Sequence, residues 1–207
     1  MRVKASICAA LGLVVFAHAL PAEAQSIIRR PGHHPKYALE LEPHALLTPF
    51  SPPGDTNGWG LGIGARGTIV LADDGFISTI NDSVGLGFGL DWLHYYDRSV
   101  GAGPCADWSL GPGGEPICRR IAGVGGDASY FYLPVVMQWN FWLHKQWSVF
   151  GEPGLGLYLQ HRDVDDSVSL GLTPTLHMGG RWHFSDWATL TMRIGYPAWS
   201  VGVSFFL

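Results

Sequence analysis

The feature that most constrains the fold is an alternation of apolar residues with polar or glycine residues at a period of two. It recurs in segment after segment of about ten residues, the strand length that a bilayer requires. The clearest segment places one apolar set against Gly85, Gly87, Gly89 and Asp91: Val84, Leu86, Phe88, Leu90 and Trp92. A helix would scatter this set, whereas a strand gathers it on one face. The pattern therefore predicts β-strands.

Eight segments share this alternation, and their apolar sets span Leu39–Ala45, Leu61–Ala65, Val84–Trp92, Phe131–Trp139, Leu155–Leu159, Leu170–Met178, Leu190–Ile194 and Trp199–Phe205. The opposite faces carry glycine, hydroxyl and charged residues, which make a poor apolar core and a good polar lumen. We therefore predict an all-β fold, an eight-stranded antiparallel transmembrane β-barrel with its apolar faces outward. After residue 24 the chain has no apolar run long enough for a spanning helix.

Aromatic residues support lipid on the outside, because they sort by strand end into two sets that resemble interfacial belts. One predicted belt contains Phe141, Trp142, Trp147, Trp182, Trp187 and Phe205, and the other contains Trp59, Trp92, Tyr95, Tyr130 and Trp199.

Residues 1–24 have the three parts of a secretory signal: basic Arg2 and Lys4, an apolar run, and small residues at Ala22 and Ala24. We expect cleavage after Ala24, a short periplasmic segment over 25–35, and one barrel domain over 36–207. The remaining chain would carry 11 basic and 16 acidic residues. A negative chain of this kind is a poor partner for nucleic acid.

The links between segments fit a barrel with both termini in the periplasm, since short turns at 144–146 and 184–186 oppose a long outer loop at 98–127. The 73–82 link is long for a periplasmic turn, and the 196–198 link is short for an outer loop. Pro43, Pro134, Pro153 and Pro174 fall inside predicted strands. Because proline removes a ladder donor, we expect bulges or pairing gaps there.

Together, the signal, the eight segments and the C-terminal segment resemble the small outer-membrane β-barrel superfamily, which includes OmpA-type and OmpX-type barrels. The resemblance covers about residues 36–207 and implies a location in the bacterial outer membrane, with membrane lipid and the barrel-assembly machinery as partners. It also implies an assembly signal in the closing strand, formed by Trp199, Val201, Val203, Phe205 and Leu207. Family members often end in phenylalanine, and this chain ends in leucine.

Candidate chemistry is sparse. His183 and Ser185 resemble the His-x-Ser pair of outer-membrane lipid A deacylases, but they sit at a predicted periplasmic turn and are interpreted as polar turn residues. The predicted lumen charges could form a relay or a substrate site, and we interpret them as interior ion pairs that fill a narrow barrel: Glu40, Glu42, Arg66, Asp91, Glu152, Arg181 and Arg193. His33, His34 and His44 match no closed ligand set, so we expect no metal site and no cofactor.

The long loop contains Cys105 and Cys118, the two cysteines left after signal removal. Export to an oxidising compartment favours a disulfide between them. The stiffened loop would either present a recognition surface for an extracellular ligand or resist proteolysis. Our leading hypothesis is a non-enzymatic barrel with a structural or surface-interaction role. The alternatives are a lipid-modifying enzyme of the deacylase or acyltransferase kind, and a narrow pore.

Overall fold

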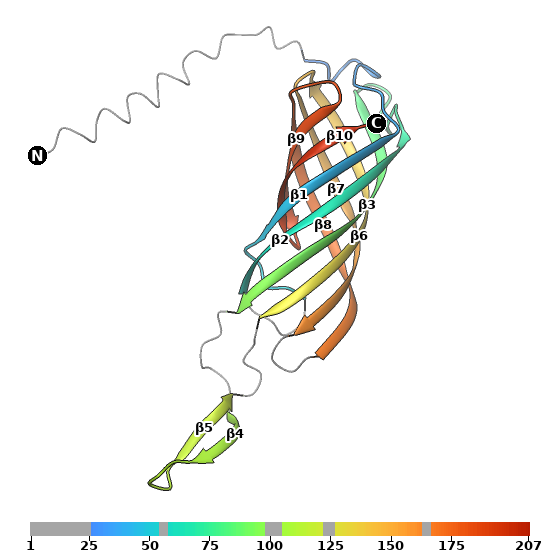
Figure 1. The fold of residues 1–207 in the computed structure, drawn as a ribbon. Helices are drawn as coiled ribbons and strands as arrows, with labels where there is room; N and C mark the ends of the chain where they lie inside the picture. The colour runs from blue at the N-terminus through green and yellow to red at the C-terminus, as the bar shows by residue number, and fades with distance from the viewer. Residues whose placement is uncertain (1–25, 54–57, 98–104, 122–126, 163–166) are drawn as a thin grey trace, which may run out of the picture.

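The computed structural model describes residues 26–53, 58–97, 105–121, 127–162 and 167–207. Eight antiparallel strands close into a barrel in the order β1-β10-β9-β8-β7-β6-β3-β2 (Figure 1). Their bounds are β1 Leu39–Thr48, β2 Gly58–Ala72, β3 Asp82–Asp97, β6 Ala128–His144, β7 Trp147–Arg162, β8 Ser167–His183, β9 Ala188–Tyr196 and β10 Trp199–Phe206. The predicted eight-stranded antiparallel barrel is confirmed. The predicted signal segment, 1–24, lies outside the described residues and stays a prediction.

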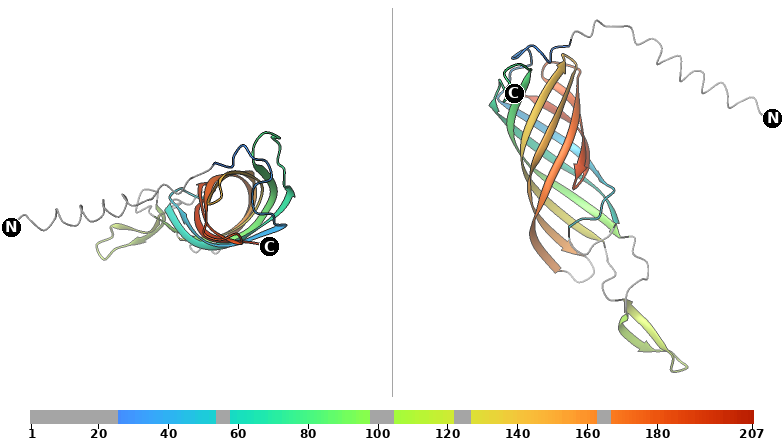
Figure 2. Two further views of the ribbon diagram at one scale, coloured as in Figure 1. Left: turned by 90° about the horizontal axis from the view of Figure 1, so that it is seen from above. Right: turned by 180° about the vertical axis from the view of Figure 1, so that it is seen from behind.

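The barrel wall has an apolar outer face and a polar inner face. Along β6 the outward side chains of Leu133, Val135 and Met137 are exposed, whereas Gln138 and Asn140 are buried. Seen along its axis, the barrel is a closed ring (Figure 2). This is the reverse of a soluble barrel, in which the apolar side chains fill the interior. Among the described residues, none belongs to a helix long and apolar enough to cross a membrane.

The aromatic belts differ in part from the prediction. Trp147 and Trp182 face outward and stack at 6.5 Å near one end of the barrel, and Trp92 and Trp199 are outward nearer the other. The prediction is wrong for three residues, because Trp142, Tyr95 and Tyr130 are buried inside the barrel. Strand parity explains the error: Trp142 is the immediate neighbour of Phe141, so it must point to the opposite face. The position of a residue near the end of a strand does not determine whether its side chain faces the lumen or the lipid.

The four strand prolines lie at gaps in the hydrogen-bonded ladders, as predicted. Around Pro43 the β1–β10 register passes from Leu41–Phe205 directly to His44–Gly202. The β3–β6 register is interrupted beside Pro134 in the same way, and the β6–β7 register beside Pro153. Pro174 lies just beyond the β8–β9 ladder, which ends at Leu176. Each proline keeps a partner on its other side, so the missing N–H faces the gap.

The N-terminal segment packs across the end of the barrel where the C-terminus lies (Figure 1). Ile27 is buried against Trp142 and Phe206, and its N–H donates to the carbonyl of Leu143 at 3.0 Å. His34 stacks on the Trp142 ring at 5.0 Å. The segment is therefore packed on the barrel and closes this end, which is the periplasmic end in the orientation that the sequence predicts.

The long 73–82 link holds this N-terminal segment in place. The Asn81 N–H donates to the Ile28 carbonyl at 2.6 Å, and the Asn81 carbonyl accepts from the Trp142 N–H at 2.9 Å. Its side-chain Oδ1 lies 2.7 Å from Nδ1 of His34. The unusual length of the 73–82 link therefore allows it to hydrogen-bond the N-terminal segment.

The outer end of the barrel is filled by aromatic side chains. Tyr95, Tyr130 and Tyr132 are buried there with Leu46, and Tyr158 packs against them. The Tyr130 hydroxyl donates to the carbonyl of Pro53 at 2.9 Å, which ties the link after β1 to this cluster. The wall is uneven at this end, because β8 pairs with β7 up to Ser167 but with β9 only from Leu176 onward.

A second, two-stranded sheet formed by β4 (Cys105–Leu110) and β5 (Pro116–Ile121) lies within the long outer loop. Figures 1 and 2 show this hairpin beyond the barrel end opposite the C-terminus. The sequence pattern predicts only a loop here, so the two strands are an addition to that prediction.

Candidate functional site: the barrel interior and the outer hairpin

Six side chains, five acidic or basic and one histidine, form a closed ring of contacts in the middle of the lumen. Arg193 Nη1 contacts Glu42 Oε1, Arg193 Nε lies 3.0 Å from Glu152 Oε2, and Arg66 Nη1 lies 2.8 Å from the same oxygen. Arg66 also reaches Asp91 at 3.3 Å. The ring, which we call the lumen ring, consists of Glu42, Arg193, Glu152, Arg66, Asp91 and His44.

His44 closes the lumen ring. Its Nε2 lies 2.8 Å from Asp91 Oδ1, and its Nδ1 lies 3.5 Å from Glu42 Oε1. The sequence pattern singles out His44 only as a candidate metal ligand, whereas the structure places it inside the barrel. Its even-numbered position beside Glu42 was the signal that linked it to the interior charges.

A second ion pair lies nearer the periplasmic end. Arg181 Nη2 donates to both carboxylate oxygens of Glu40 at 2.9 Å, and Nη1 donates to Asn140 Oδ1. The Phe150 ring lies between this pair and the lumen ring, with the guanidinium of Arg181 4.2 Å and that of Arg193 5.0 Å from its centroid. Cation–π contacts of this kind favour an Arg that is removed from water.

The structure thus brings all seven predicted lumen charges inside the barrel, in two groups joined through Phe150. Every carboxylate faces an opposite charge, which buried charges require. The narrow lumen is crossed by these side chains between the aromatic clusters at its two ends. These ion pairs join strands that are not neighbours in the barrel wall.

His183 and Ser185 do not contact each other among the described interactions. Ser185 Oγ accepts from the Ala188 N–H at 3.0 Å, which makes it a turn residue. His183 Nε2 instead lies 2.8 Å from Ser148 Oγ, a pair that the sequence analysis missed because it joins neighbouring strands. Ser148 and His183 are both buried beneath the N-terminal segment, where His183 packs on Trp142 and Phe206. A nucleophile needs access to its substrate, and this position gives none.

The three histidines considered for metal lie apart. His33 and His34 are in the N-terminal segment, and His44 belongs to the lumen ring. Within the described part of the chain, no cluster of three or more His, Cys, Asp or Glu side chains is arranged to hold a metal ion.

The outer hairpin is closed by the disulfide Cys105–Cys118, whose Cα atoms lie 5.8 Å apart. Trp108 pairs with Cys118 and Leu110 with Pro116, so Trp108 and Leu110 share one face of the hairpin. Ile117 pairs with Ser109 on the reverse face. Trp108 is 59% exposed and Leu110 is 79% exposed. Apolar side chains that form a contiguous exposed patch mark interaction sites in many proteins.

The predicted assembly-signal residues lie on β10 and at its end. Trp199 and Val201 are exposed on the outer wall, and Phe205 stacks with Trp187. The Leu207 N–H donates to the Leu39 carbonyl at 2.8 Å, which joins the two ends of the barrel sequence. These contacts do not test recognition by the assembly machinery, so that role stays a prediction.

A closed antiparallel barrel with an apolar wall, a charged lumen and outward tryptophans defines a small transmembrane β-barrel of the bacterial outer membrane. The chain has the architecture of the small outer-membrane β-barrel superfamily, as its sequence pattern predicts.

No family model matches the chain, and no curated protein matches it. One similar solved structure is that of Ail, the attachment invasion locus protein of Yersinia pestis, in complex with the heparin analogue sucrose octasulfate. Its TM-score is 0.47 at 9% sequence identity, and the match covers 82% of this chain and 97% of Ail. Neisserial surface protein A has a TM-score of 0.45 at 13% identity, covering 83% of this chain and 96% of that protein. The assignment to the outer membrane rests on the barrel's own geometry.

Proposed function

We propose that this protein is a non-enzymatic outer-membrane barrel that presents its disulfide-closed hairpin to a partner outside the cell. The observation that carries the proposal is the pair Trp108 and Leu110, both exposed on one face of a hairpin tied by Cys105–Cys118. Tryptophan is enriched among residues that dominate binding energy, because it removes a large apolar area from water at a small entropic cost.

The disulfide supports recognition because it limits the conformations of the hairpin before binding. The hairpin then loses less conformational entropy when a partner binds, because it is already ordered. An apolar face of this kind fits a protein partner better than a polysaccharide, which offers mainly hydroxyl groups. The barrel supports the hairpin as a rigid anchor, with a lumen held by buried ion pairs.

The proposal is tested with outer-membrane vesicles that carry the protein, measured for attachment to immobilised matrix proteins, to polysaccharide and to cells of the same strain. A Trp108→Ser, Leu110→Ser variant should attach less than the wild type to a protein surface. Ile117→Ser on the reverse face is the matched control and should attach normally. Equal attachment by all three proteins on every surface would contradict a recognition role for this hairpin.

A further inference from the structure

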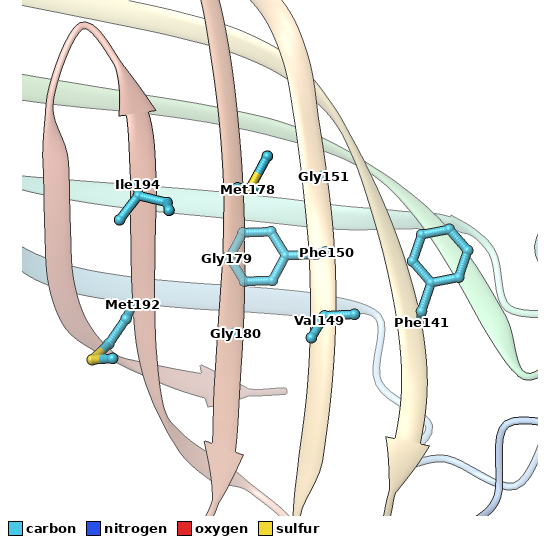
Figure 3. Close-up of a pocket in the computed structure, with 9 residues that line it drawn as sticks. All are labelled: Phe141, Val149, Phe150, Gly151, Met178, Gly179, Gly180, Met192 and Ile194. Atoms are coloured by element: carbon cyan, nitrogen blue, oxygen red, sulfur yellow. The ribbon is translucent and has the colours of Figure 1, made fainter.

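Two glycines interrupt the apolar outer wall near the periplasmic end. Gly151 of β7 and Gly180 of β8 occupy outward positions, between neighbours such as Val149 and Met178 that carry large side chains. The missing side chains leave a groove of about 560 Å³ between β6, β7, β8 and β9 (Figure 3). Its lining is almost entirely apolar, with Val149, Met178, Met192 and Ile194 around the glycines.

Packing does not explain these two glycines. A Cβ added at Gly151 would meet no atom within 4 Å, and one at Gly180 would meet only the Ser148 carbonyl at 3.9 Å. Gly179 is different, because a Cβ there would lie 2.2 Å from the Phe150 ring. Both open positions therefore have room for the Cβ of an alanine. A strand glycine that packing does not require often marks the close approach of another molecule.

The groove lies at the depth of the periplasmic leaflet. Val149 and Gly180 form a cross-strand pair, and two residues further along the outward faces are Trp147 and Trp182, which stack in the interfacial belt. A groove in this position opens to hydrocarbon, and its walls lose dispersion contacts unless an apolar chain fills it.

A second hollow, of about 480 Å³, lies at the periplasmic rim below the belt and has a different chemical character. Lys145 from the β6–β7 turn and Asp186 from the β8–β9 turn line it, together with His33, His34 and Lys36 of the N-terminal segment. Lys36 is engaged by Asp73 at 3.0 Å, and this hydrogen bond raises the pKa of Lys36 above its ordinary value. Within the described residues Lys145 has no ion-pair partner.

We propose that the groove and the rim together bind one phospholipid of the periplasmic leaflet, with an acyl chain along Gly151 and Gly180 and the headgroup between Lys145 and Asp186. The Lys145 ammonium fits a phosphate, and the Asp186 carboxylate fits a primary ammonium. This charge pattern selects a zwitterionic ethanolamine headgroup over a glycerol headgroup. The site is independent of the outer hairpin and of any surface-interaction role.

Native mass spectrometry tests the site on full-length protein reconstituted with equal amounts of phosphatidylethanolamine and phosphatidylglycerol, then released into a delipidating detergent. The wild type should retain one phospholipid, with ethanolamine preferred. Gly151→Leu should reduce retention by about tenfold, because the leucine side chain occupies the groove. Gly180→Leu repeats the test on the neighbouring strand. Ala65→Leu places a leucine on the outward face of β2 and is the control, which should retain lipid as the wild type does.

Headgroup selection is tested separately. Asp186→Asn should abolish the preference for ethanolamine, and Lys145→Gln should weaken retention of both lipids. Heat-dependent mobility in electrophoresis verifies that each variant is folded. Equal retention by Gly151→Leu, Gly180→Leu and Ala65→Leu would overturn the site. A wild-type complex that contains two protein copies in place of lipid would also overturn it, and an unchanged preference in Asp186→Asn would overturn the headgroup assignment.

Discussion

Arg193 and Glu152 face each other across the middle of the lumen, where Arg193 Nε lies 3.2 Å from Oε1 and 3.0 Å from Oε2 of Glu152. Glu152 also accepts from Arg66 and from the Gln138 amide, each at 2.8 Å. One carboxylate therefore contacts two guanidinium groups, from strands β2 and β9. This makes Glu152 the residue on which most of the lumen ring depends.

Glu152→Gln should destabilise the barrel by about 1 to 3 kcal/mol, because Arg66 and Arg193 each lose a buried charge-assisted hydrogen bond and keep only Asp91 and Glu42 as carboxylate partners. The loss is measured as the shift in urea unfolding of the protein in lipid vesicles, followed by tryptophan fluorescence. Glu115→Gln makes the same change at an exposed position of the hairpin and should alter stability little. Equal stability of the two variants would show that the lumen ring contributes little to folding.

Val135→Arg should disfavour the inserted barrel by about 2 to 4 kcal/mol, because it places a charge at the hydrocarbon midplane. Val135 is exposed on the outer wall, midway along β6 between Phe131 and Trp139. Leu143→Arg is the control on the same strand, beyond Phe141 at the periplasmic end, and should cost about 0 to 1 kcal/mol. The two costs are compared through urea unfolding in vesicles. Equal costs would mean that the membrane does not lie at this height of the barrel.

The wild-type protein should show little or no steady conductance in planar bilayers. Ile27, Trp142 and Phe206 pack at the periplasmic end, and Tyr95, Tyr130 and Tyr132 pack at the outer end. An ion would also have to pass the lumen ring, where the charged groups are already paired. Large and stable channels in single-protein recordings would favour the pore alternative over a closed barrel.

The period-two pattern was enough to predict the barrel and the inward charges, because strand geometry assigns alternate residues to opposite faces. The same rule places Trp142, Tyr95 and Tyr130 inside, where the structure has them, whereas aromatic type alone predicts them in the belts. Local pattern and strand parity must therefore be applied together.

Other features depend on contacts between distant residues, which a local pattern does not encode. His34 stacks on Trp142, 108 positions away along the chain, and no periodicity in the N-terminal segment indicates this contact. The Ser148–His183 pair joins neighbouring strands whose register was unknown from the sequence. The groove at Gly151 and Gly180 likewise requires the β7–β8 register, because the two glycines mark a single site only when the strands are aligned.

The last prediction concerns the disulfide Cys105–Cys118, which ties β4 to β5 beyond the barrel wall. Thiol labelling of the denatured, unreduced mature protein should find no free cysteine. Closing a loop of this size is worth about 3 kcal/mol in the chain-entropy model. Because the hairpin forms a sheet of its own, that stabilisation should act on the hairpin and leave the barrel unchanged.

A Cys105→Ser, Cys118→Ser variant should therefore insert with the wild-type heat-dependent mobility, yet be cut faster by protease between residues 105 and 121. Ser109→Ala in the same hairpin is the control and should keep wild-type resistance. Loss of insertion in the double variant would show that the hairpin and the barrel fold as one unit, and unchanged protease resistance would show that the disulfide does not order the hairpin.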